Sequence, residues 1–98
     1  MLPLVQVGEK LSLLNRSRID IIANILGVSG EGTKKTHIMY RCNLSFRQLH
    51  AYLNLLVDRK LLRKVVRKES SRQELYETTS KGKAFLQAYK GIKALLGA

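Results

Sequence analysis

Five residues near the middle of the chain have the side chains and the spacing to contact the edges of DNA bases: Arg47, Gln48, His50, Ala51 and Asn54. Arginine pairs with O6 and N7 of guanine, which makes Arg47 a candidate for a guanine contact. Gln48 or Asn54 is the candidate for N6 and N7 of adenine. Ala51 is small enough to let the helix approach the bases closely. The alternative interpretation is an ordinary solvated helix face.

A second set of residues is suited to hold the DNA backbone. Lys34, Lys35 and Thr36 stand at the expected start of a helix, where the free N–H groups and the helix dipole attract a phosphate. A basic cluster follows further along the chain. The predicted backbone contacts are Lys34, Lys35, Thr36, Ser45, Arg63, Lys64, Arg67, Lys68 and Arg72.

The charge balance points to a polyanionic partner. Residues 33–72 contain 11 of the 18 Lys and Arg residues but only Asp58 and Glu69 among the acids, a local balance of +9 in a chain of net charge +11. Such a concentration favours a nucleic acid, with duplex DNA as the leading candidate. Paired lysines can also serve solubility alone, and this interpretation stays open for Lys34 and Lys35.

Other chemistry is not indicated by the sequence. His37, Cys42 and His50 lack the spacing of metal ligands, and no glycine-rich phosphate loop or catalytic set of Ser, His and Asp occurs. We therefore expect no enzymatic activity, no metal and no cofactor. A single cysteine is consistent with a reducing compartment. No apolar run approaches the roughly 20 residues of a membrane span, so we expect a cytoplasmic, nucleoid-associated protein.

Three helices are expected in the first two thirds of the chain, after an N-terminal arm over 1–14. The first begins near Ser17 and is ended by Gly27 and the S-G-E-G run at 29–32. It buries Ile19, Ile22, Ala23 and Leu26. The second is capped by Thr33, continues to about Arg41 and turns Ile38 and Met39 inward. A turn over 42–44 places Asn43 in a left-handed conformation. Ser45 and Gln48 form a capping box for the third, whose packed side is Phe46, Leu49, Leu53, Leu56 and Val57.

The last third of the chain predicts two strands and a helix. The strands cover 61–67 and 74–78, and Thr79 caps a helix over 80–96. On that helix a seam suited to a dimer interface recurs at 4-3-4 spacing: Phe85, Tyr89, Ile92 and Leu96. Three helices, a two-stranded β-wing and a C-terminal helix make an α+β, mostly α fold, the winged helix-turn-helix, over residues 15–98.

The stretch from Lys35 to Phe46, K-T-H-I-M-Y-R-C-N-L-S-F, resembles a segment of small archaeal winged helix-turn-helix DNA-binding proteins. That family comprises predicted transcriptional regulators and includes ten-kilodalton chromatin-associated members. Leu61 to Arg63, Tyr76 and Thr79 to Gly82 resemble its strand entry, second wing strand and last helix. The wing, roughly 63–75, is longer here. The ten-kilodalton members form their dimer through an antiparallel coiled coil of an extended last helix, and this chain departs from them in that helix. A homodimer is expected here because operator half-sites mirror a two-fold protein, with the seam on the last helix as its interface.

The residues and the resemblance together predict a duplex-DNA-binding transcriptional regulator or nucleoid-associated protein. The third helix would enter the major groove while the basic wing follows the backbone. Two alternatives remain open at this point. One is a winged-helix module that binds another protein through the third helix, and the other is a protein that binds structured RNA.

Overall fold

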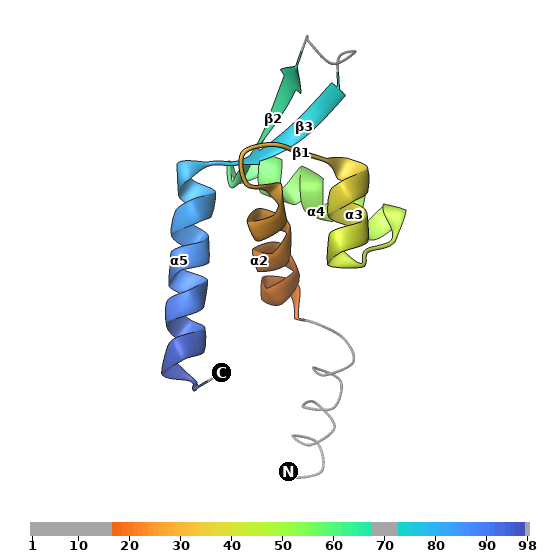
Figure 1. Ribbon diagram of the computed structural model, residues 1–98. Helices are drawn as coiled ribbons and strands as arrows, with labels where there is room; N and C mark the ends of the chain where they lie inside the picture. Colours follow the sequence, from red (N-terminus) through yellow and green to blue (C-terminus); the bar gives the residue numbers. More distant parts are fainter. Residues whose placement is uncertain (1–16, 68–72, 98) are drawn as a thin grey trace.

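The computed structural model describes residues 17–67 and 73–97. The predicted arm over 1–14 and the predicted backbone contacts Lys68 and Arg72 lie outside these residues. Four helices and three strands are described, in the order α2 (Arg18–Ser29), β1 (Thr33–Lys34), α3 (Lys35–Cys42), α4 (Phe46–Asp58), β2 (Leu62–Arg67), β3 (Gln73–Thr78) and α5 (Ser80–Leu95). In Figure 1 the β2–β3 hairpin projects from one end of the helical body, and α5 lies beside α2.

A single apolar core joins α2, α3, α4 and the base of the hairpin. Its completely or almost completely buried members are Ile25, Leu26, Ile38, Cys42, Leu49, Leu53, Leu56 and Leu62. The side chains of Phe85 and Leu86 on α5 and Tyr52 on α4 pack against its edge. The winged arrangement predicted from the sequence is confirmed, with the helices outnumbering the strands.

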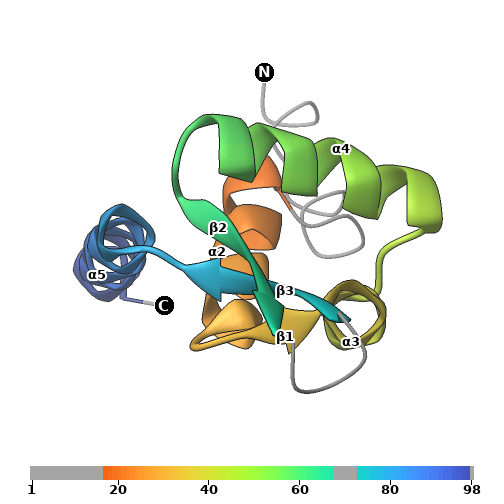
Figure 2. The same ribbon diagram turned by 90° about the horizontal axis from the view of Figure 1, so that it is seen from above.

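The first predicted helix is present and ends within the predicted run at 29–32, and its packed face includes Ala23 and Leu26 as predicted, but Ile19 was predicted wrongly. α2 passes through Gly27 and continues to Ser29, where the Ser29 hydroxyl donates to the Ile25 carbonyl at 2.7 Å. Ile19 is exposed, whereas Ile21 and Ile25 are buried. The face predicted for α2 is that of a helix that packs against one neighbouring element. Figures 1 and 2 instead show α2 between α3, α4 and α5, so its buried stripe is wider and turned away from Ile19.

The sheet contains a short strand that the sequence did not predict. β1 pairs with β3 through Thr33 opposite Tyr76 and Lys34 opposite Leu75, which gives a three-stranded antiparallel sheet in the order β1-β3-β2. Thr33 was expected to cap the second helix, and this was wrong. Its hydroxyl donates to the carbonyls of Val28 and Ser29, so it closes the end of α2, and Lys34 is the residue that precedes α3.

The turn between α3 and α4 agrees with the prediction. Asn43 adopts the left-handed conformation with φ 53° and ψ 56°. Ser45 then precedes α4, and both halves of the capping box are present: Gln48 N donates to Ser45 Oγ at 3.2 Å, and Ser45 N donates to Gln48 Oε1 at 3.0 Å. These two bonds satisfy two backbone donors at the start of the helix.

The hairpin is anchored to the body at its base. β2 and β3 pair from Leu62 opposite Thr78 to Arg67 opposite Gln73. The buried Thr78 hydroxyl donates to the Leu26 carbonyl at 2.6 Å, which ties β3 to the end of α2. Thr79 caps α5 as predicted, accepting from Gly82 N at 3.0 Å. The direction of the wing is therefore fixed by the core rather than by the hairpin alone.

Candidate nucleic-acid interface

α4 presents an exposed face that contains four of the five predicted base-contacting residues. Its hydrophobic side buries Leu49, Leu53 and Leu56. The four predicted residues that are exposed on the remaining surface are Arg47, Gln48, Ala51 and Asn54. Seen along the wing in Figure 2, α4 spans one side of the molecule, and its first turn lies at the end nearer to α3. A helix held in this way can offer its N-terminal half to a groove of the duplex.

The capping box restricts what Gln48 and Ser45 can do. The Gln48 carbonyl oxygen already accepts from Ser45 N, and the Ser45 hydroxyl accepts from Gln48 N. An adenine contact of the bidentate kind needs both the oxygen and the nitrogen of an amide. Gln48 would have to give up its capping bond to make one. Asn54 is exposed and lies beyond the capped turn, so the capping box does not engage its amide.

Phe46 and His50 depart from the sequence prediction. Phe46 was expected on the packed side of the helix, yet 58% of its surface is exposed. His50 was expected to face bases, but it is half-buried, and its Nε2 is buried with no hydrogen-bond partner. The two rings meet edge-to-face with centroids 4.3 Å apart. The prediction for His50 is corrected accordingly: its ring supports Phe46 rather than offering Nε2 to a base.

Two of the predicted backbone contacts on the wing are paired with acids. Arg63 forms a salt bridge with Glu77, and the Lys64 ammonium lies 3.9 Å from the Glu74 carboxylate. Both acids come from β3: Glu77 lies directly opposite Arg63, and Glu74 lies diagonally across the hairpin from Lys64. The charge balance of residues 33–72 does not include these two glutamates, because both follow Arg72 in the sequence. The two predicted strands of the hairpin could have indicated these ion pairs, because opposite charges on paired strands lie close enough to interact.

Arg67 belongs to a different basic surface, a notch where the wing meets the start of α3. Lys34, His37 and Arg67 line the notch together with uncharged residues of β1 and β3, and none of its described lining residues is acidic. A Cβ added at Gly32 would lie only 3.7 Å from Nη2 of Arg67, so this side chain reaches across toward β1. The notch brings together charges that are 33 positions apart in the sequence.

Lys35 and Thr36 occupy the first turn of α3. Thr36 is exposed, and the Lys35 ammonium lies 5.8 Å from the centre of the Phe46 ring. The start of α3 therefore adjoins the start of α4. Both positions were predicted to hold a phosphate, and the backbone donors of a first helical turn remain available for that purpose.

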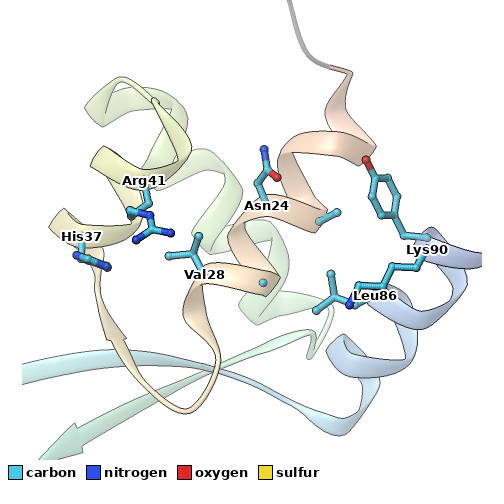
Figure 3. A pocket seen from close by; sticks show the side chains of 9 residues that line it. Asn24, Val28, His37, Arg41, Leu86 and Lys90 are labelled. Atoms are coloured by element: carbon cyan, nitrogen blue, oxygen red, sulfur yellow. The ribbon is translucent and has the colours of Figure 1, made fainter. Parts of the chain in front are cut away.

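A groove on another face of the molecule lies between α3 and α5, and α2 forms its floor (Figure 3). Its volume is about 490 Å³, and its basic lining residues are His37, Arg41 and Lys90. In Figure 3, Arg41 and Lys90 come from opposite walls, and Val28 and Leu86 supply apolar surface between them. His37 lines both this groove and the basic notch.

The predicted dimer seam on α5 divides into two halves. Phe85 packs against the core edge, and the Tyr89 hydroxyl donates to the Asp20 carboxylate on α2. Ile92 and Leu96 are exposed, as is Leu95 beside them. The Ser17 hydroxyl, and after it the Tyr89 hydroxyl, lowers the pKa of Asp20, while the bond to Asp20 raises the pKa of Tyr89.

The described residues give little support to other chemistry. Over 17–67 and 73–97, no group of three or more His, Cys, Asp and Glu side chains is placed to hold a metal ion. Cys42, the single cysteine of the sequence, is buried. None of the described helices is both long and apolar enough to cross a membrane.

The fold and this surface define a winged helix-turn-helix protein. The chain belongs to the winged helix-turn-helix family, whose model matches residues 15–96. Sso10a-2, a DNA-binding protein from Sulfolobus solfataricus, has a similar structure with a TM-score of 0.72 and 21% identity, over 84% of this chain and 83% of that one. The similarity predicted from the Lys35 to Phe46 segment is thereby confirmed.

A bacterial regulator shares the same architecture. MepR from Staphylococcus aureus, solved as a complex with DNA, matches with a TM-score of 0.69 and 17% identity, over 93% of this chain and 75% of that one. MepR is also described as a transcription regulator of the multidrug efflux pump MepA. No curated protein sequence matches this chain significantly. At these identities the structural likeness establishes the fold, and function depends on the residues of this chain.

Proposed function

We propose that this protein binds duplex DNA as a transcriptional regulator or nucleoid-associated protein. The observation that carries the proposal is that basic side chains from the wing and from the start of α3 lie close to one another and to the first turn of α4. Lys34 and Arg67 share a notch without a described acidic lining residue, and Lys35 adjoins the first turn of α4. Closely spaced cations of this kind suit successive phosphates of a duplex backbone.

Within this proposal the residues divide into two roles. Lys34, Lys35 and Arg67 hold phosphates and position the protein without selecting a sequence. Arg47 and Asn54 lie on the exposed face of α4, where a guanidinium and a free amide can contact guanine and adenine. Arg63 and Lys64 add less to affinity than the sequence suggested, because each already faces a glutamate.

Replacement of Arg67 by alanine tests the backbone role. We expect Arg67→Ala to weaken binding to unrelated duplexes by the same factor, and to reduce the slope of log K against log salt by about 0.9. Lys90→Ala is the matched control, because it removes the same charge from α5, on the face that carries the groove of Figure 3. The measurement is a fluorescence anisotropy titration of labelled duplexes at several salt concentrations.

Equal losses for Arg67→Ala and Lys90→Ala would contradict the proposal, since only net charge would then matter. Duplex RNA of the same sequence serves as a competitor in the same titration. Stronger competition by RNA than by DNA would favour the structured-RNA alternative.

One observation favours a second candidate, binding of another protein by α4. Leu55 on α4 is 40% exposed and lines an open surface depression with Arg18, Ala51 and Tyr52. Substitution of Leu55 by lysine distinguishes the two candidates. It adds a positive charge, so it preserves or strengthens DNA binding, whereas it would disrupt a docked apolar partner.

We also propose that the protein acts as a homodimer through the distal half of α5. Support comes from Ile92, Leu95 and Leu96, which expose apolar surface at the end of the helix farthest from the wing. Two half-sites related by a two-fold axis are the usual target of a helix-turn-helix dimer. The seam is thus shorter than predicted, because Tyr89 is engaged with Asp20 in its own chain.

A further inference from the structure

Phe46 is a large aromatic residue that the fold exposes at the first position of α4. More than half of its surface, 58%, is accessible, whereas Leu49, Leu53 and Leu56 of the same helix are buried. Phe46 is not among the residues that pack against the core. A single exposed apolar side chain is common on protein surfaces, so the case for a function depends on how the Phe46 ring is held and where it lies.

The start of α4 does not depend on the Phe46 ring. The capping box of Ser45 and Gln48 closes the first turn. Leu44 and Leu49 occupy the positions on either side of the cap where an apolar pair normally fixes the entry of the chain, and both are buried. Phe46 lies between these two residues in the sequence and takes part neither in the capping box nor in the apolar pair.

The ring is nevertheless held in place. His50, one turn further along α4, meets it edge-to-face at an interplanar angle of 71°, with centroids 4.3 Å apart. The Lys35 ammonium from α3 lies 5.8 Å from its centroid. Two elements thus constrain an exposed side chain, which lowers the conformational entropy lost when it contacts a partner.

The position of the ring indicates what it can contact. The first residues of a recognition helix reach the base edges, and Arg47 is the next residue along. In the major groove, thymine presents an apolar substituent, its C5-methyl group, and phenylalanine is one of the side chains that pack on it. Lys35 beside the ring suits the adjacent phosphate.

We propose that Phe46 determines part of the sequence preference by packing against the C5-methyl group of thymine. This inference rests on the proposed function, since it requires α4 to enter the major groove. It adds an apolar contact to the polar contacts of Arg47 and Asn54. It also assigns His50 the role of a positioning residue, which keeps the Phe46 ring oriented.

The test compares duplexes that differ only in that methyl group. One duplex contains thymine, and its twin contains deoxyuridine at every thymine position. For the wild-type protein we expect about fourfold weaker binding to the deoxyuridine duplex for each methyl group that is contacted, which corresponds to about 0.8 kcal/mol. Phe46→Ala should bind the two duplexes equally, and Phe46→Leu should retain part of the difference.

Tyr40→Ala is the matched control, because Tyr40 on α3 is the most exposed described tyrosine, at 80%, and should not affect the ratio. Circular dichroism verifies that Phe46→Ala remains folded, as its exposure predicts. A wild-type protein that binds both duplexes with equal affinity would overturn the role of Phe46 while leaving DNA binding intact. A preference of Phe46→Ala for the thymine duplex as large as that of the wild type would overturn this role as well. Failure to bind any duplex would overturn the proposed function and this inference with it.

Discussion

Arg47 and Asn54 carry the base-contacting part of the proposal because their polar groups are exposed and uncommitted to the capping of α4. Gln48 stands on the same surface, but its carbonyl oxygen completes the capping box. The structure therefore distinguishes two amides that the sequence left equivalent. A side chain that caps its own helix must break an internal hydrogen bond before it can make an external one, and this lowers the net gain.

The bond between Tyr89 and Asp20 gives a pH dependence that Tyr89→Phe should reveal. The pKa of Asp20 is lowered, chiefly by the Ser17 hydroxyl and next by Tyr89, so its contribution to stability is present above the ordinary Asp value of about 3.9 and is lost as pH falls through the lowered value. The pKa of Tyr89 is raised by Asp20, so its contribution is present below about 10 and is lost as pH rises through the raised value.

We therefore expect wild type to exceed Tyr89→Phe in free energy of unfolding near neutral pH, by less than about 1 kcal/mol because solvent screens the pair. The difference should vanish at both pH extremes. Urea unfolding across pH, followed by circular dichroism, measures it. A difference that stays constant at low pH would show that the lost hydroxyl acts through packing rather than through Asp20.

At the scale of elements, the junction of β2, β3 and α5 depends on a glycine. A Cβ at Gly82 would stand 2.4 Å from the Leu61 carbonyl oxygen and 2.7 Å from Cγ2 of Thr78. The first of these contacts is with backbone and cannot be relieved by a side-chain rotation. Gly82 thus permits the first turn of α5 to approach the strand entry closely.

We expect Gly82→Ala to lower the free energy of unfolding by about 1–3 kcal/mol, the usual cost of overpacking. Gly91→Ala on the same helix is the control, because a Cβ there meets nothing within 4 Å. It should leave stability unchanged or raise it by up to about 1 kcal/mol through helix propensity. Thermal unfolding of the two variants makes the comparison, and equal melting temperatures would refute the close-approach argument.

The elements that were predicted correctly carry strong local signals. Ser45 and Gln48 mark the start of α4, Asn43 marks the preceding turn, and Thr79 marks α5, because each depends on residues at most three or four positions away. β1 was missed because two residues have no periodicity of their own, and their pairing with β3 depends on partners about 40 positions later.

The site was predicted less completely than the fold, and tertiary contacts explain why. The exposure of Phe46 depends on Leu44 and Leu49 filling the space beside the cap, which periodicity alone does not show. The pairing of Arg63 with Glu77 depends on the hairpin register. The notch of Lys34 and Arg67 exists only because β1 and β2 flank the same strand.

At the scale of the whole molecule, the proposed homodimer depends on α5. Sedimentation velocity at micromolar concentration should give twice the 11.1 kDa mass of the chain. Ile92→Glu should shift the species to a monomer, because it places a charge within the exposed apolar end of α5. Gln87→Glu makes the same change in charge at an exposed polar position of α5, and it should leave the dimer intact. A monomeric wild type would refute the proposed assembly.

The most direct test of the central claim is the salt dependence of duplex binding by the unmodified protein. If its basic surface neutralises about six phosphates, the association constant should fall by about 10³-fold between 50 and 200 mM salt. Anisotropy titrations of one labelled duplex across this range give the slope. A steep linear dependence of log K on log salt is the predicted result. A flat dependence would contradict the account, since the duplex backbone would then not be the partner of Lys34, Lys35 and Arg67.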